Sequence, residues 1–191
     1  MLTHADLYSL EHYARARPEF RARVMAHKKN RQVALGPNAT LYFEDRLTMQ
    51  YQVQEMLRLE RIFEADLIQD ELDVYNPLIP DGTNWKATFM VEYSDPEERK
   101  AQLARMIGIE KAVWVQVADF ARVAPIANED LDRETEEKTS SVHFLRFELT
   151  APMIAALKKG AALTMGIDHP AYQATATPSA AVRESLLMDL E

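Results

Sequence analysis

The chain has 191 residues, 47% of them hydrophobic and 27% charged, a balance typical of a globular protein with one substantial domain or two small ones. It contains no cysteine, which excludes disulfides, cysteine-ligated iron–sulfur clusters and thiol catalysis within this chain. No apolar run approaches the roughly 20 residues of a membrane span, and charged residues near the start argue against a signal peptide, so we expect a cytoplasmic protein.

The net charge of −8 is unevenly distributed. Residues 15–31 include seven bases and one acid, whereas residues 129–138 include six acids and two bases. The basic segment fits either a solvated helix face or contact with nucleic acid or an acidic partner. The acidity of the whole chain argues against a dedicated nucleic-acid binder.

The first 45 residues predict two helices and a hairpin. Thr3 or Asp6 can cap a short first helix, and Pro18 suits the first turn of a second helix that runs to about residue 31. Strands at 32–35 and 40–44 flank a Gly-Pro-Asn turn, which is typical of a hairpin.

Residues 49–63 predict a central helix, capped by Asp45, around which the rest of the chain is organised. Its apolar residues cover most of the circumference, so we expect it to be largely buried. The polar face contains Gln50, Gln54, Arg58 and Arg61. Carboxylates inside or beside the apolar stripes require partners because an unpaired buried charge is costly; these are Glu55 and Glu60.

A further helix is predicted after residue 63, through Leu67, Ile68, Leu72 and Tyr75. It ends at Asn76-Pro77, since the residue before a proline disfavours the helical region. The loop that follows, residues 78–84, is the expected internal boundary.

The second half predicts the order β-α-β-β-α-β, with strands at 85–93, 112–117, 141–149 and 162–167 and helices that begin near Asp95 and Pro152. This order is typical of a ferredoxin-like fold. A strand at 172–176 and a helix at 178–190 are expected to follow. We therefore predict an α+β protein in which an N-terminal helical segment with a hairpin (1–80) packs on a ferredoxin-like half (85–191) as one integrated globule.

Seven polar residues are candidates for a binding site: Glu55, Arg58, Glu71, His143, Arg146, Asp168 and His169. One hypothesis joins them in a small-ligand or metal pocket between the central helix and the sheet, with Glu55, His143 and His169 as metal ligands. The structural alternatives are an ion-pair network of Glu55, Arg58, Glu60, Arg61 and Glu71, a solvated sheet face, and a simple turn at 168–170. No Glu-x-x-His, His-Glu-x-x-His, phosphate loop or serine elbow occurs, and no nucleophile–base pair is evident.

Several strings resemble a bacterial family known as domain of unknown function 3501. They are RPEFR (17–21), VALGP (33–37), YQVQEMLR (51–58), ELDVYNPLIP (71–80), HFLRFEL (143–149) and GIDHPAY (166–172). The resemblance covers nearly the whole chain and provides no catalytic residues. It implies a genetic context, because genes of this family often lie beside those of a rubrerythrin-like protein and a heterodisulfide-reductase-like iron–sulfur protein.

Two functions follow as expectations. The first is an accessory protein of redox or peroxide-stress metabolism that docks an iron–sulfur or rubrerythrin-type partner through the basic helix and the acidic loop. The alternative is a small-ligand or metal-binding protein, or an enzyme, that uses the Glu/Arg/His pocket between the central helix and the sheet. The sequence identifies no cofactor, substrate or oligomeric state.

Overall fold

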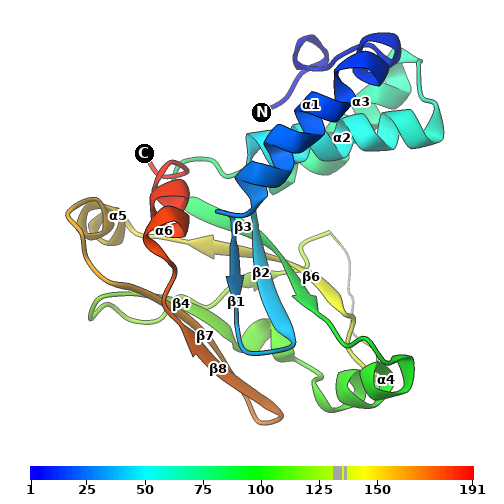
Figure 1. Ribbon diagram of the computed structural model, residues 1–191. Helices are drawn as coiled ribbons and strands as arrows, with labels where there is room; N and C mark the ends of the chain where they lie inside the picture. The colour runs from blue at the N-terminus through cyan, green and yellow to red at the C-terminus, as the bar shows by residue number, and fades with distance from the viewer. Residues whose placement is uncertain (131–134, 136) are drawn as a thin grey trace. The chain divides into compact units, whose positions relative to one another are not determined.

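The computed structural model describes residues 1–130, 135 and 137–191 and has an α+β fold (Figure 1). Within these residues the strands form a five-stranded sheet, in the order β1-β2-β3-β6-β5, and a three-stranded sheet, in the order β4-β7-β8. The chain divides into two compact units. The first contains residues 1–30 and 44–80, and the second contains residues 31–43 and 81–191.

The first unit is helical in its described elements, which are η1 (His4–Asp6), α1 (Leu10–Lys28), α2 (Arg46–Glu60), α3 (Ala65–Tyr75) and η2 (Asn76–Leu78). The predicted cap of the central helix is confirmed, since Asp45 Oδ1 accepts the Thr48 N–H at 2.9 Å. Helix α2 ends at Glu60, where Arg61 adopts the left-handed conformation. The Ile62 N–H then bonds the Leu57 carbonyl at 3.0 Å, which closes the helix end.

The expected break at Pro18 is wrong, because α1 runs through it as one helix of 19 residues. Proline in a helix removes one hydrogen bond, here to the Ala14 carbonyl, at a cost of about 3 kcal/mol. Both Ala14 and Pro18 are exposed, so water can solvate the freed carbonyl. Tyr13 and Phe20, which lie on either side of Pro18, are both buried and hold the two halves of the helix against the rest of the unit.

The extent of burial predicted for the central helix needs two corrections. Gln54, placed on the polar face, is fully buried, because its amide bonds the backbone N–H and C=O of Tyr8 at 2.6 and 3.3 Å. Leu59 and Phe63, placed in the apolar stripes, are 63% and 69% exposed. The early end of α2 explains the exposure of Phe63, since this residue lies beyond the helix and outside its packed face.

The second unit contains all eight strands of the described chain: β1 (Gln32–Ala34), β2 (Ala39–Glu44), β3 (Asn84–Val91), β4 (Val113–Val117), β5 (Ile126–Ala127), β6 (Val142–Glu148), β7 (Leu163–His169) and β8 (Tyr172–Ala176). Its helices are α4 (Pro96–Arg105), η3 (Ile109–Ala112), α5 (Ala151–Lys158) and α6 (Ala180–Leu187). The predicted hairpin at 32–44 and the strand at 172–176 are confirmed. Strand β5 is too short to be evident in the sequence.

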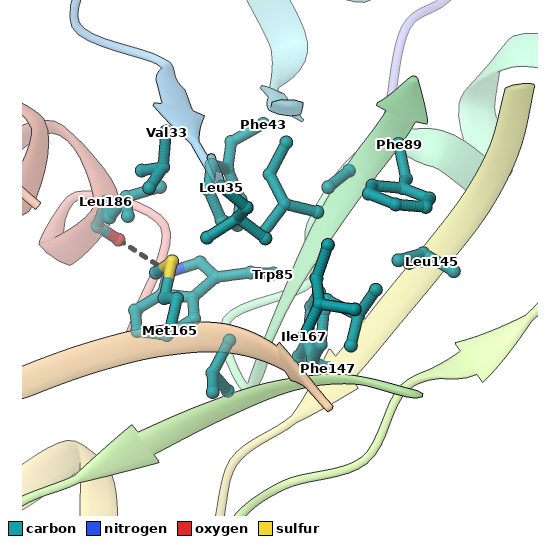
Figure 2. Close-up of a cluster of buried hydrophobic side chains, with 14 of the residues drawn as sticks. Val33, Leu35, Phe43, Trp85, Phe89, Leu145, Phe147, Met165, Ile167 and Leu186 are labelled. Carbon is teal, nitrogen blue, oxygen red and sulfur yellow. Dashed lines mark hydrogen bonds between the residues drawn. The ribbon is translucent and has the colours of Figure 1, made fainter. Parts of the chain in front are cut away.

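The inner faces of both sheets meet in one core (Figure 2). Residues alternate along β3 and β6, so that Trp85, Phe89, Leu145 and Phe147 point inward. Trp85 is fully buried, and its indole N–H donates to the Leu186 carbonyl of α6 at 2.9 Å. This bond fastens the last helix to the core.

The ferredoxin-like sheet is not found in the described strands. That topology would place β7 beside β3 and β4 beside β6. Instead β2 of the hairpin occupies the free side of β3, and β5 occupies the free side of β6. Because both positions are taken, β4 and β7 pair with each other and form the second sheet with β8. Only the central antiparallel pair, β3 with β6, matches the prediction.

Helix starts in this unit follow the sequence signals. Asp95 and Thr150 are the N-cap residues of α4 and α5, and proline is the first residue of α4 and the second of α5. Helix α6 begins at Ala180, two residues later than predicted, and its N-cap is Ser179, whose hydroxyl accepts the Val182 N–H. No helix in the described part of the chain combines the length and apolar character needed to cross a membrane.

Candidate functional site

Glu55 lies on α2 and is the centre of a hydrogen-bonded cluster in the first unit. Arg17 of α1 binds its carboxylate through two bonds, Nε to Oε1 at 2.7 Å and Nη2 to Oε2 at 2.9 Å. The hydroxyl of Tyr13, one helical turn earlier, donates to Oε1 at 2.8 Å. Arg58 adds a longer bond to Oε2 at 3.3 Å. The prediction that Glu55 requires partners is confirmed, although the main partners come from α1.

These contacts perturb the ionisation of the cluster. The hydrogen bonds from Arg17 lower the pKa of Glu55 to about 2, with further lowering by Tyr13 and Arg58 and an opposing effect of burial. Burial and the bond to Glu55 raise the pKa of the Tyr13 hydroxyl. Glu55 is therefore a permanent anion at neutral pH with its charge neutralised by arginine, which makes it a poor general base.

Arg58 and Glu71 are the other candidates in this unit. The Arg58 Nε is buried and has no hydrogen-bond partner among the described residues. Glu71 lies on α3, half-buried, and its pKa is raised by burial and by the neighbouring charges of Glu60 and Asp70. The expected ion-pair network is reduced to Glu55 and Arg58, because Glu60 and Arg61 are exposed.

His143 is fully buried on the core face of β6, in the second unit. The Phe144 N–H donates to Asn128 Oδ1 at 3.1 Å, so the amide nitrogen of Asn128 faces His143 Nδ1 at 2.9 Å and must donate to it. His143 Nε2 lies 2.9 Å from the Ser140 carbonyl, which can only accept. The imidazole therefore carries its proton on Nε2.

Beside this histidine lies Glu110 of η3, which is 1% exposed. Its Oε2 is 3.9 Å from His143 Nε2 and has no hydrogen-bond partner among the described residues. The Thr139 hydroxyl completes the shell at 3.0 Å from Nε2. Glu110 could not be identified from sequence, because a lone glutamate after a helix end is normally a surface residue.

Arg146 lies on the opposite face of β6 and is held by two carboxylates. Its Nε and Nη2 bind Glu129 at 2.9 and 2.7 Å, and Nη1 pairs with Glu148. The bonds from Arg146 lower the pKa of Glu129. Arg146 and Glu148, two residues apart on β6, thus form an ion pair on this face of the sheet.

The last two residues of β7, Asp168 and His169, have different surroundings. Asp168 is exposed and pairs with Arg122, whose guanidinium lies 3.8 Å from the centre of the Trp114 ring. His169 is 9% exposed, accepts the Ala171 N–H at Nδ1 (3.1 Å) and donates from Nε2 to the Ile107 carbonyl at 2.9 Å. Both ring nitrogens of His169 are thus used to fix the turn.

The seven candidates fall into two sets: Glu55, Arg58 and Glu71 in the first unit, and His143, Arg146, Asp168 and His169 in the second. Within each unit the described contacts bring together only Glu55 with Arg58. Across residues 1–130, 135 and 137–191 no group of three or more histidine, aspartate or glutamate side chains could hold a metal ion. The metal-pocket hypothesis stays a prediction.

Docking was predicted through two charged segments, the basic residues 15–31 and the acidic residues 129–138, and the structure describes the first completely and the second only in part. The bases of residues 15–31 are mostly engaged in contacts inside the molecule: Arg15 with Glu11, Arg17 with Glu55, Arg23 over Phe20, Lys28 over Tyr51 and Arg31 with Asp189. Half of the acidic segment 129–138, namely residues 131–134 and 136, lies outside the described residues.

Sequence reasoning missed a group of exposed apolar residues on α2, on α3 and in the segment that joins them. Eight large hydrophobic residues are exposed in the described chain, and four of them fall between residues 59 and 74. We call these four the α2–α3 apolar patch: Leu59, Phe63, Leu67 and Val74, with exposures of 63%, 69%, 47% and 62%. The sequence did contain a signal for this patch. Leu67 and Val74 are seven residues apart and share one stripe of the helix, whereas Ile68, Leu72 and Tyr75 lie on another.

Comparison with known proteins agrees with the resemblance noted in the sequence. The family model described as "Protein of unknown function (DUF3501)" matches residues 1–190. A crystal structure of a protein of unknown function from Burkholderia pseudomallei K96243 is similar, with 52% sequence identity and a TM-score of 0.94. The match covers 100% of this chain and 99% of that chain. Among curated proteins no match was found. The chain belongs to the DUF3501 family.

Proposed function

We propose that this protein is an accessory, partner-binding protein of cytoplasmic redox or peroxide-stress metabolism, and that it acts with a rubrerythrin-like protein and an iron–sulfur protein. The observation that carries the partner-binding role is the α2–α3 apolar patch. Exposed large hydrophobic residues that gather on one part of a surface are typical of protein-interaction sites. The identity of the partners rests on the gene context that the family resemblance implies.

The charged candidates support this role over catalysis. Glu55, His143 and His169 each have hydrogen-bond partners within their own unit, and those partners fix their orientation. A catalytic acid or base needs a free position for the substrate. The alternative, a ligand or metal pocket, has no comparable supporting contact in the described chain.

The test is co-purification from cells that express the chain together with a rubrerythrin-like protein and a heterodisulfide-reductase-like iron–sulfur protein, the kinds of partner that the family resemblance implies. The Phe63→Ser/Leu67→Ser variant is compared with the wild type. Its matched control is Ile126→Ser/Met188→Ser, which changes two exposed apolar residues of the second unit. We expect the wild type and the control to retain a partner, and the patch variant to lose it. Retention of the partner by the patch variant, or recovery of neither co-expressed protein by the wild type, would overturn the proposal.

A further inference from the structure

The segment that carries the α2–α3 apolar patch is acidic. Between residues 60 and 73 there are six acids and one base. The acids are Glu60, Glu64, Asp66, Asp70, Glu71 and Asp73. All but the half-buried Glu71 are exposed. The patch therefore combines an apolar centre with an acidic rim.

One of the acids of the rim lies next to the apolar residues of α3. Glu71 follows Leu67 by four residues and precedes Val74 by three, so the three share one face of α3. Its carboxylate lies near the charges of Glu60 and Asp70. No described base forms an ion pair with these three acids. A cation placed over this face would relieve their mutual repulsion.

Building on the proposed function, we infer that the α2–α3 apolar patch binds a basic amphipathic helix of the partner protein. The apolar stripe of that helix would cover Phe63, Leu67 and Val74. Its lysine or arginine residues would face the acidic rim. This is the helix-in-groove mode of recognition, with electrostatic complementarity setting the choice of partner.

The architecture of the first unit favours a helix as the occupant. Its described elements are helical, so it offers no strand edge for a β-strand to extend. Helix α3 has 11 residues, which corresponds to about 16 Å. A partner helix of three to four turns would be long enough to cover it.

Two other occupants fit less well. If a second copy of the chain bound through its own patch, two acidic rims would repel each other. If it bound through its basic helix α1, that helix would offer no large exposed hydrophobic residue to cover the patch. An anionic membrane surface would repel the acidic rim. The combination of apolar centre and acidic rim thus selects a basic, amphipathic protein segment.

The experiment is a titration of the full chain with two synthetic peptides of about 15 residues. Both have leucine at helical spacing, and the remaining positions are lysine in one peptide and glutamate in the other. We expect the lysine peptide to bind, with weaker binding at higher salt, and the glutamate peptide not to bind. Phe63→Ser/Leu67→Ser should weaken binding at least about tenfold, whereas Ile126→Ser/Met188→Ser should not.

A charge-reversed variant tests the rim separately. Asp70→Lys/Asp73→Lys changes two exposed residues in the last turns of α3, where added lysines also suit the helix dipole. This variant should bind the lysine peptide more weakly than the wild type does, and it should bind the glutamate peptide. Equal binding of both peptides, binding of neither, or binding of anionic vesicles in place of the peptides overturns this inference. If the lysine peptide fails while the patch variant still loses its cellular partner, the proposed function stands and only the basic-helix inference falls.

Discussion

Arg17 binds the carboxylate of Glu55 through two hydrogen bonds, of 2.7 and 2.9 Å, between neighbouring helices of the first unit. This bidentate contact joins α1 to α2 on a side chain that is 14% exposed. Such charge-assisted pairs fix orientation as well as adding stability. The contact explains why a glutamate is found within the apolar helix.

Replacing Glu55 with glutamine should destabilise the first unit by about 2 kcal/mol at pH 7, because Arg17 and Arg58 lose their counter-charge. Far-ultraviolet circular dichroism during urea unfolding follows this unit, since it contains the three longest helices. Tryptophan fluorescence serves as the internal control, because Trp85 and Trp114 both lie in the second unit. A similar loss of stability reported by both probes would contradict a local role for Glu55.

The stability difference between the wild type and Glu55→Gln should also depend on pH. The pKa of Glu55 is lowered from 4.5 to about 2, so the folded state binds fewer protons than the unfolded state between these values. The stability that the carboxylate contributes is fully present above about pH 4.5 and is lost as the pH falls toward 2. The difference between wild type and Glu55→Gln should therefore be constant from pH 5 to 7 and shrink in acid. Urea unfolding of both proteins at each pH, followed by far-ultraviolet circular dichroism, measures this difference. A difference that stays the same in acid would contradict the prediction.

In the second unit, replacing Arg31 with methionine should cost about 3–5 kcal/mol, because it leaves the Asp189 carboxylate buried without its main counter-charge. Arg31 and Asp189 are 2% and 8% exposed, and the closest contact between them is 2.7 Å. The double variant Arg31→Met/Asp189→Leu removes both charges and should recover part of the loss. Tryptophan fluorescence during urea unfolding measures each step. If the double variant is less stable than the single one, the buried charge of Asp189 is not the cause.

Gly166 should not tolerate alanine. A Cβ at this position would lie 2.5 Å from the Ala174 carbonyl oxygen and would overlap the Trp114 indole, which crosses β7 at the glycine. Such overpacking costs about 2 kcal/mol or more. Thr164→Ala, two residues earlier on the same strand face, is the matched control and should cost less than 1 kcal/mol, roughly the effect of an ordinary surface change. An unchanged melting temperature for Gly166→Ala would refute the close packing of Trp114.

The proton of His143 is predicted to reside on Nε2. Nitrogen chemical shifts of the imidazole, measured by nuclear magnetic resonance on histidine-labelled protein, distinguish the two neutral tautomers and the charged form. We expect the Nε2–H form, because Asn128 donates to Nδ1 and Ser140 accepts from Nε2. In Asn128→Ala, Nδ1 loses its donor and the signal should shift. A doubly protonated ring at pH 7 would show instead that Glu110 pairs with a charged histidine.

Local features of the fold were predictable where a single residue type determines them. Asp45 as a helix cap, Asp95-Pro96 as a helix start and the hairpin of residues 32–44 all follow from short-range chemistry, and all are confirmed. The order of strands was not predictable in the same way. It depends on β2 and β5 taking the places beside β3 and β6, and pairing over such distances leaves no local signature.

The candidate site was predictable only in part. The sequence indicated that Glu55 needs partners, but not that Tyr13 and Arg17 would supply them, since contacts between helices depend on how the helices pack. Apolar periodicity also assigned Leu59 and Phe63 to the core, although both are exposed. Phe63 lies beyond the end of α2, and Leu59 lies in its last turn. Hydrophobic pattern alone does not distinguish a core stripe from a docking surface.

The most direct test of the partner-docking role is amide hydrogen exchange on the complex purified from native cells. With the partner bound, we predict slower exchange concentrated in residues 59–74, around the α2–α3 apolar patch. Exchange in this segment that is unchanged by the partner, with protection elsewhere in the chain, would contradict the account.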